Sequence, residues 1–230
     1  MSSLLDKIRS RGYWRVVIRP QTFVEKRISQ ITELYPIIQN TSVQLRGWDF
    51  PHLDEPHTPL LIDIDWIGQE SEWENLLEIW RFYQSGQFID IAGMQEDWYD
   101  QRRSIPAIFG KWKPGLILGI GNTLFRFTEI FEFAARLAMT QAGDDAMHIE
   151  ITVSNLIGRK LRVDSPNRMP THHDYTASIK ELPYEVELSR TELIAAPREL
   201  ALKPAIELFR RFGWEPNQDI LRDQQKELRR

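Results

Sequence analysis

The segment from Leu77 to Gly93, which reads LEIWRFYQSGQFIDIAG, decides the class of fold. Two runs rich in aromatic and β-branched residues flank a short Gln-Ser-Gly turn, and this arrangement is typical of an antiparallel hairpin. The stretch HIEITVSNLIGRKLRVD, residues 148–164, has the same form around a loop that contains Gly158. It predicts a second hairpin, so the sheet should be at least partly antiparallel.

A long amphipathic segment between the two hairpins predicts the central helix of the core. In residues 122–143, apolar side chains recur at spacings of three and four, which is the period of a helix face buried against other elements. A cap at Asn122 or Thr123 is expected to begin this helix. Its charged residues are expected to form ion pairs on a narrow exposed edge, and they are Arg126, Glu129, Glu132 and Arg136.

The two ends of the chain predict further elements. Ser3 is expected to cap a short helix that stops at Gly12, and the pattern Ser189-Arg-Thr-Glu192 is a capping box that begins a helix near the C-terminus. Residues 13–19 alternate in the manner of a half-exposed strand. A helical segment and the strand-like residues 42–48 follow, which together predict a βαβ-like opening.

These elements predict an α+β fold, with a mixed, largely antiparallel sheet whose two hairpins pack on a central buried helix and on C-terminal helices. The βαβ-like opening leaves an α/β fold as the alternative. No Gly/Ser-rich linker divides the sequence. We therefore expect a single domain over residues 1–230, with residues 1–12 and 214–230 as peripheral helices.

The composition restricts the chemistry that the chain can perform. It contains no cysteine, which excludes disulfides, thiolate nucleophiles and zinc fingers, so any divalent metal would need histidine and carboxylate ligands. The N-terminal residues lack the apolar core of a signal peptide, and no apolar run is long enough to span a bilayer. We expect a cytoplasmic protein without membrane contacts.

The charge is distributed unevenly along the chain. Residues 51–100 contain one Arg against twelve acidic residues, whereas residues 1–50 contain eight Lys or Arg against four acidic residues. The plain interpretation is that these two parts fold against each other. The functional interpretation is an acidic, Trp-rich surface that contacts a protein partner or a cationic ligand without catalysis. The predicted binding residues are Trp48, Trp66, Glu70, Glu72 and Trp73.

A Pro-rich loop provides the first alternative. His52, Asp54 and His57 form an H-x-D-x-x-H pattern, and Asp63 and Asp65 lie close by in the sequence. Imidazole and carboxylate groups are suitable ligands for zinc, manganese or iron, so the 49–65 loop could belong to a metal-dependent hydrolase or nuclease. The flanking prolines exclude the helix on which H-E-x-x-H sites are built. The loop can equally be an ordinary surface connection.

Nucleic-acid binding is the second alternative. It would use the basic residues Arg9, Arg11, Arg15 and Arg19 and would weaken steeply with salt. The glycines of GLILGIGNTL, residues 115–124, superficially resemble a phosphate-binding turn, but Leu124 occupies the third glycine position of the dinucleotide fingerprint. A dinucleotide site is therefore not predicted. Self-association into a homo-oligomer stays open.

Two segments resemble sequences of known proteins. YWRVVIRP, from Tyr13 to Pro20, and LRGWDFPH, from Leu45 to His52, are similar to segments of uncharacterised bacterial proteins that have no assigned activity. The resemblance implies a bacterial, cytoplasmic origin and no mechanism. It also directs attention to the RGWDFPH segment.

Overall fold

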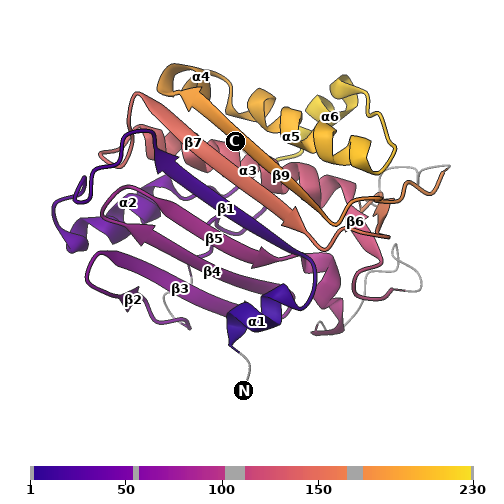
Figure 1. Ribbon diagram of the computed structural model, residues 1–230, viewed down its shortest axis with the longest axis horizontal. Helices are drawn as coiled ribbons and strands as arrows, with labels where there is room; N and C mark the ends of the chain where they lie inside the picture. The colour runs from indigo at the N-terminus through magenta and orange to yellow at the C-terminus, as the bar shows by residue number, and fades with distance from the viewer. Residues whose placement is uncertain (1–2, 54–56, 102–111, 165–172, 229–230) are drawn as a thin grey trace.

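One large antiparallel sheet organises the structure. The computed structural model describes residues 3–53, 57–101, 112–164 and 173–228. Seven strands form the sheet in the order β2-β3-β4-β5-β1-β7-β9, and every neighbouring pair is antiparallel (Figure 1). The strands are β1 (Tyr13–Pro20), β2 (Leu61–Ile62), β3 (Trp66–Trp73), β4 (Leu76–Tyr83), β5 (Phe88–Gly93), β7 (Ala146–Ser154) and β9 (Glu181–Ser189).

Helices cover one face of this sheet (Figure 1). The longest is α3 (Ile120–Ala138), whose apolar residues face the sheet so that Phe127 packs edge-on against Trp14 of β1. The other helical elements are α1 (Leu4–Arg9), α2 (Leu34–Thr41), α4 (Arg190–Ala195), α5 (Pro197–Arg211), α6 (Gln218–Gln225) and the short 3-10 turns η1 (Ile31–Glu33) and η2 (Gln95–Gln101). Along the described chain, none of these helices has the length and apolar character needed to cross a bilayer.

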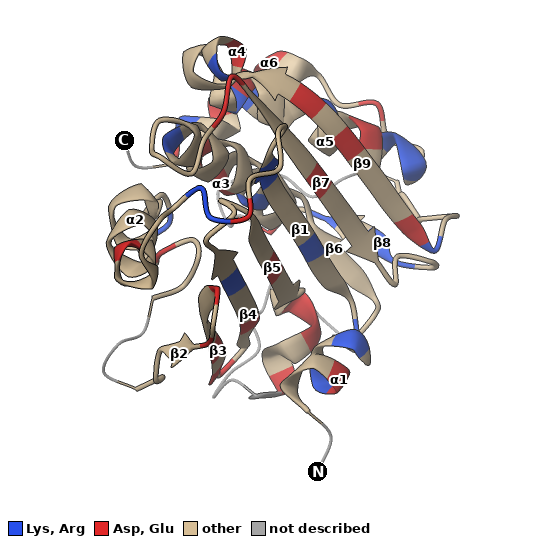
Figure 2. Ribbon diagram, turned by 60° about the vertical axis from the view of Figure 1, so that its left-hand side comes forward, with Lys and Arg blue, Asp and Glu red and all other residues tan. Residues whose placement is uncertain are grey.

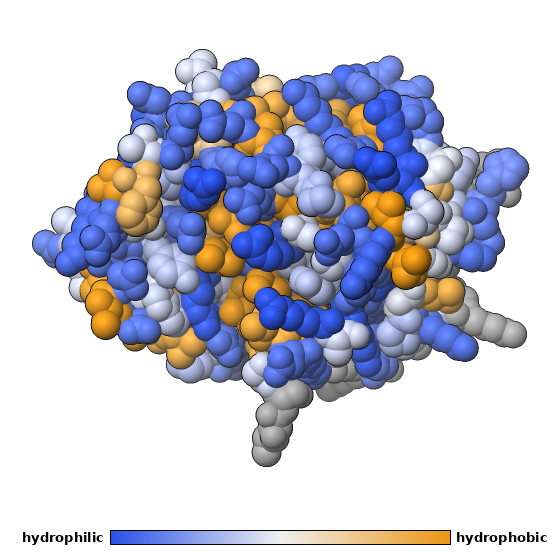
Figure 3. Space-filling view, in the orientation of Figure 1, coloured by the Kyte–Doolittle hydropathy of each residue, from blue (hydrophilic) through white to orange (hydrophobic). Residues whose placement is uncertain are grey.

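The opposite face of the sheet is largely open. Among the described helices, α1 covers its end near Trp98, where Ile8 packs with Leu77 and Trp98. Elsewhere on this face, acidic positions lie along β9 and basic positions along β1 (Figure 2). Apolar patches lie between the charged side chains (Figure 3). The fold is therefore a sheet with one helical layer, which confirms the predicted α+β class.

The local patterns were reliable guides where the partners are close in sequence. The hairpin of residues 77–93 forms as β4 and β5, the strand of residues 13–19 forms as β1, and Ser3 and Ser189 both cap helices through complete capping boxes. The predicted second hairpin is wrong. After β7 the chain forms β8 (Lys160–Arg162), which pairs in parallel with β6 (Ile117–Gly119) in a separate two-stranded sheet, while β9 takes the place beside β7.

The βαβ-like opening is also wrong. Residues 42–48 form no strand, since only an isolated bridge joins Val43 to Phe50, and β1 pairs antiparallel with β5 and β7. The predicted ion pairs along an exposed edge of the central helix do not form either. Glu129 is completely buried, and the four charged residues of α3 contact groups outside the helix.

A buried ion pair joins segments that are far apart in the sequence. The Asp97 carboxylate of η2 makes a two-pronged contact with the Arg159 guanidinium, and both side chains are almost fully enclosed. The same carboxylate accepts hydrogen bonds from the backbone amides of Gly12 and Gly115. Arg159 also donates to the carbonyl oxygen of Ile117 at 2.9 Å. The arginine of this pair comes from the last third of the chain, so it is not a contact between residues 1–50 and residues 51–100 of the kind that the charge asymmetry suggests.

Replacing Arg159 by methionine is expected to lower the free energy of unfolding by about 3–5 kcal/mol, because Asp97 would stay buried without its cationic partner. Urea denaturation at neutral pH measures this change. The matched control is Arg211→Met, because Arg211 lies 3.5 Å from Glu207 in an exposed pair, and its effect should stay within about 0.5 kcal/mol. Equal effects of the two substitutions would contradict a structural role for the buried pair.

Candidate functional site

A pocket opens between the helix-covered face of the sheet and the N-terminal end of α3. Its cavity has a volume of about 40 Å³. That space suits a few waters or the head group of a small ligand. The polar lining residues are Arg46, Asp49, Glu78, Gln95, Glu96, Asn122, Thr123 and Arg126, and two tryptophans, Trp14 and Trp48, complete much of the wall.

The RGWDFPH segment forms one side of this pocket. The carboxylate of Glu78 accepts a hydrogen bond from the backbone amide of His52 at 2.9 Å, and the indole of Trp80 donates to the His52 carbonyl at 2.9 Å. Arg46 binds Glu129 of α3 through two hydrogen bonds of 2.8 and 2.7 Å. The segment is thereby fixed between β4 and α3, and Trp48, which is 40% exposed, lies at the mouth.

A second arginine, Arg126, bridges α3 to the sheet below. Its guanidinium lies 2.5 Å from the Asp90 carboxylate and 3.4 Å from that of Glu78, and it stacks on the ring of Phe50. Asp90 is fully buried, and its second oxygen has no hydrogen-bond partner. This arrangement explains why the sheet tolerates two carboxylates on its covered face.

Carboxylates also occupy the N-terminal end of α3. Asp164 accepts hydrogen bonds from the amides of Gly121 and Asn122 at 2.8 and 2.7 Å, and Glu96 accepts one from Gly119 at 3.0 Å. Gly119 is the N-cap, so the expected cap at Asn122 or Thr123 is wrong. Because free helix amides and the helix dipole attract anions, these side chains fill the position that a phosphate would take in a dinucleotide site.

Burial changes the acidity of these groups. Removal from water raises the pKa of the Glu96 carboxyl, and the nearby Asp164 charge raises it further, although hydrogen bonds to the carboxylate oppose the shift. Burial also raises the pKa of Asp90 well above its ordinary value, against the opposing effect of Arg126, and raises that of Asp164. Glu96 in the lining and the neighbouring Asp90 and Asp164 therefore retain protons more readily than exposed carboxyls do.

The charges do not balance within the lining. Arg46 is paired with Glu129 and Arg126 with Asp90, and neither of those carboxylates lines the pocket. Glu78 shares Arg126 with Asp90, at 3.4 Å, and the lining carboxylates Asp49 and Glu96 remain beyond these pairs. Among the described residues, the buried hydroxyl of Thr123 in the same wall has no hydrogen-bond partner. A ligand that donates hydrogen bonds and brings positive charge would match these groups.

The structure disperses the predicted acidic, Trp-rich binding residues. Trp48 lines the pocket, whereas Trp66 lies on the open face beneath Arg81, which also pairs with Glu70. Glu72 pairs with Lys7 of α1, and Trp73 is 65% exposed at the end of β3. Trp80 and Trp98 are part of the buried interior.

The two histidines of the Pro-rich loop line one pocket. His52 and His57 share it with Thr58, Ser71, Glu72 and Trp73, while Asp54 lies outside the described residues. In the described ranges, one group of three His or acidic side chains places its ligand atoms within 4.8 Å of one another. That group lies on β7 and β9 and contains neither loop histidine. A metal site in the 49–65 loop stays a prediction.

The basic residues proposed for nucleic-acid binding mostly face acids. Arg11 binds the Asp100 carboxylate through two hydrogen bonds, of 3.0 and 2.9 Å. Arg15 and Arg19 both approach Glu150, at 3.6 and 3.9 Å. Their charge is thus partly offset, and nucleic-acid binding stays a prediction without further support.

The sequence analysis did not single out Glu78, Asp90 or Glu96, and it placed Arg126 on an exposed edge of the central helix and not in a site. For two of them a signal was present, because Glu78 alternates in phase with the buried Trp80 and Phe82 of β4, and Asp90 with Phe88 of β5. An acid on the apolar side of a strand indicates a buried carboxylate. Glu96 lies in an irregular turn, where periodicity gives no such signal.

Comparisons with known proteins add no assignment. No family model, no curated protein and no solved structure matches this chain significantly.

The raised pKa of Glu96 predicts how stability depends on pH. The folded protein holds this proton more tightly than the unfolded chain, so the contribution of Glu96 is greatest below the ordinary pKa of about 4.3 and is lost as the pH rises through the folded-state value. Glu96→Gln keeps an oxygen for the Gly119 amide but cannot ionise. Its unfolding free energy should therefore rise relative to the unaltered protein between about pH 4 and pH 8, measured by urea denaturation.

The variant Glu192→Gln is a control whose stability, relative to the unaltered protein, should change with pH in the opposite direction. Hydrogen bonds from Ser189 lower the pKa of Glu192, so its stabilising contribution is present above the ordinary pKa and is lost as the pH falls. The Glu192→Gln variant should lose stability relative to the unaltered protein as the pH rises. The same direction of change in both variants would contradict a buried, proton-retaining Glu96.

Proposed function

We propose that the protein is a non-enzymatic binding protein whose pocket at the N-terminal end of α3 receives the head group of a cationic ligand. The observation that supports this proposal most strongly is the charge balance, in which two lining arginines serve five carboxylates. Glu129 pairs with Arg46, Asp90 and Glu78 share Arg126, and Asp49 and Glu96 lie beyond these pairs. A free ammonium or guanidinium group, or that of a Lys or Arg side chain from a partner, provides the missing charge and several donors.

The size and the walls of the pocket support the same class of ligand. A cavity of about 40 Å³ accommodates a head group and not a whole nucleotide. Trp14 and Trp48 provide aromatic walls, and cations pack favourably against indole rings. The polar rim and the exposed Trp48 leave the rest of the ligand outside, in contact with solvent or with the surface of the protein.

The cellular location, the origin, the partner and the oligomeric state of the protein stay predictions. The absence of cysteine supports a cytoplasmic location, and the two segments that are similar to bacterial proteins support a bacterial origin. A protein partner and a homo-oligomer are both compatible with a pocket that takes one side chain. Catalysis is not part of the proposal.

Binding of n-butylammonium and n-butylguanidinium tests the proposal, with 1-butanol and butyrate as neutral and anionic counterparts. Isothermal titration calorimetry should show one site for the cations and none for the counterparts. Glu78→Gln and Asp49→Asn should each weaken binding by roughly tenfold, the effect of one charge-assisted hydrogen bond. Asp49 lies on a partly exposed loop, so that variant retains the fold if Glu78→Gln does not.

Glu70→Gln is the control, because Glu70 lies on β3 outside the pocket and pairs with Arg81. It should leave cation binding unchanged. If binding depended on Glu70 and not on Glu78 or Asp49, the ligand would belong to the acidic surface and not to the pocket. If neither n-butylammonium nor n-butylguanidinium bound, the proposal would be overturned.

A further inference from the structure

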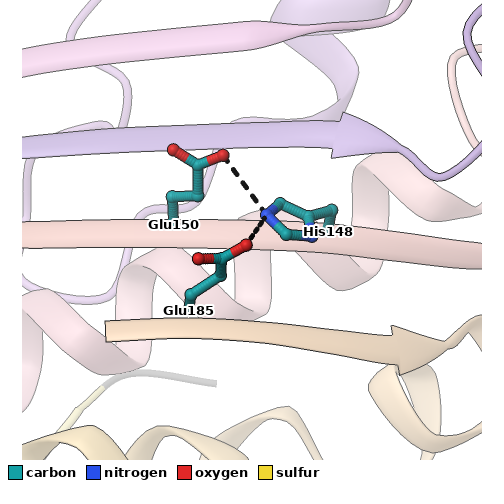
Figure 4. A group of neighbouring side chains, drawn as sticks. All are labelled: His148, Glu150 and Glu185. Atoms are coloured by element: carbon teal, nitrogen blue, oxygen red, sulfur yellow. Dashed lines mark ion pairs between the residues drawn. The ribbon is translucent and has the colours of Figure 1, made fainter. Parts of the chain in front are cut away.

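A histidine and two glutamates converge on the open face of the sheet. His148 and Glu150 are two residues apart on β7, so their side chains lie on the same face. Glu185 lies directly opposite Glu150 in the antiparallel pairing of β7 with β9. Figure 4 shows the imidazole turned toward the two carboxylates. None of these residues belongs to the pocket at α3, so the group is independent of the proposed function.

The distances match the spacing of ligands around a metal ion. The Nε2 atom of His148 lies 3.2 Å from Oε1 of Glu150 and 3.0 Å from Oε1 of Glu185. Ligands that each lie about 2.0–2.2 Å from a zinc ion are separated from one another by roughly 3–3.5 Å. An ion placed among the three atoms would thus reach each of them at an ordinary bond length after small side-chain adjustments.

The imidazole nitrogen is the second observation that points to a ligand. His148 is 9% exposed, and its buried Nε2 atom has no hydrogen-bond partner in the described part of the chain, although two carboxylate oxygens lie within 3.2 Å. Neither oxygen therefore lies along the direction in which Nε2 would donate a hydrogen bond. That is the arrangement expected when the nitrogen directs its lone pair at an ion shared with both oxygens.

The surrounding charges favour a cation at this point. Glu150 and Glu185 face each other across two strands, and like charges in that position destabilise a sheet unless a cation lies between them. Glu187 is opposite His148 and accepts a hydrogen bond from Gln21. On the other side, Arg15 and Arg19 of β1 approach Glu150 only at 3.6 and 3.9 Å, beyond hydrogen-bond distance.

We propose that His148, Glu150 and Glu185 bind a divalent transition-metal ion, with Zn²⁺ as the best match to one imidazole and two carboxylates. Three protein ligands leave at least one coordination position for water or for a donor atom of another molecule. The Glu185 side chain is 69% exposed, so this position faces solvent on the open side of the sheet.

Calorimetric titration of the full chain with ZnCl₂ tests the site, with MnCl₂ and MgCl₂ as further probes. One Zn²⁺ per chain is expected, with a Kd of roughly 10 µM or tighter and no comparable binding of Mg²⁺. His148→Gln and Glu185→Gln should each weaken Zn²⁺ binding by roughly tenfold or more. Because Glu185 is largely exposed, its variant should fold even if the His148 variant does not, and circular dichroism checks both.

His57→Ala is the matched control, since it removes a histidine from the Pro-rich loop and leaves the sheet intact. It should bind Zn²⁺ as the unaltered protein does. In the Co²⁺-loaded protein, the visible absorption of the metal should change with His148→Gln and not with His57→Ala. Loss of Zn²⁺ in His57→Ala alone, unchanged binding in both sheet variants, or no stoichiometric Zn²⁺ in the unaltered protein would each overturn the assignment.

Discussion

Carboxylates that leave water on folding need cationic or hydrogen-bonding partners, and this requirement shapes the interior of the protein. The acidic part of the sequence places Glu78, Asp90, Glu96 and Asp97 inside. Their partners come from elsewhere in the chain, above all Arg126 on α3 and Arg159 before β8. The ion pairs therefore determine how the central helix and the region around β6 and β8 sit on the sheet.

The pocket at the N-terminal end of α3 contains more carboxylates than cationic partners for them. Arg46 is paired with Glu129, and Arg126 is shared by Asp90 and Glu78, so Glu96 depends on neutral donors and on a retained proton. A cationic ligand would replace the proton as the partner of such a group. Cation binding and proton release would then be linked, and affinity for the cation would increase as the pH rises through the raised pKa values.

The sequence was informative where structure is local and silent where it depends on distant partners. The hairpin of residues 77–93 and the helix α3 follow from turn residues and periodicity. By contrast, β9 reads ELPYEVELS, and its exposed glutamates and internal proline conceal a strand that only pairing with β7 creates. Trp48 was predicted as a binding residue from the sequence around it. The sequence does not show which of the twelve acidic residues in the segment 51–100 are buried and which are exposed. The Glu185 ligand could not be found before its strand was known.

The carboxyl group of Glu96 tests the central claim most directly. Its ¹³C chemical shift can be followed through a pH titration by NMR, with and without n-butylammonium. A buried, uncompensated pocket predicts a pKa above the ordinary value of about 4.3 in the free protein and a lower value when the cation is bound. An ordinary pKa that the cation leaves unchanged would contradict it.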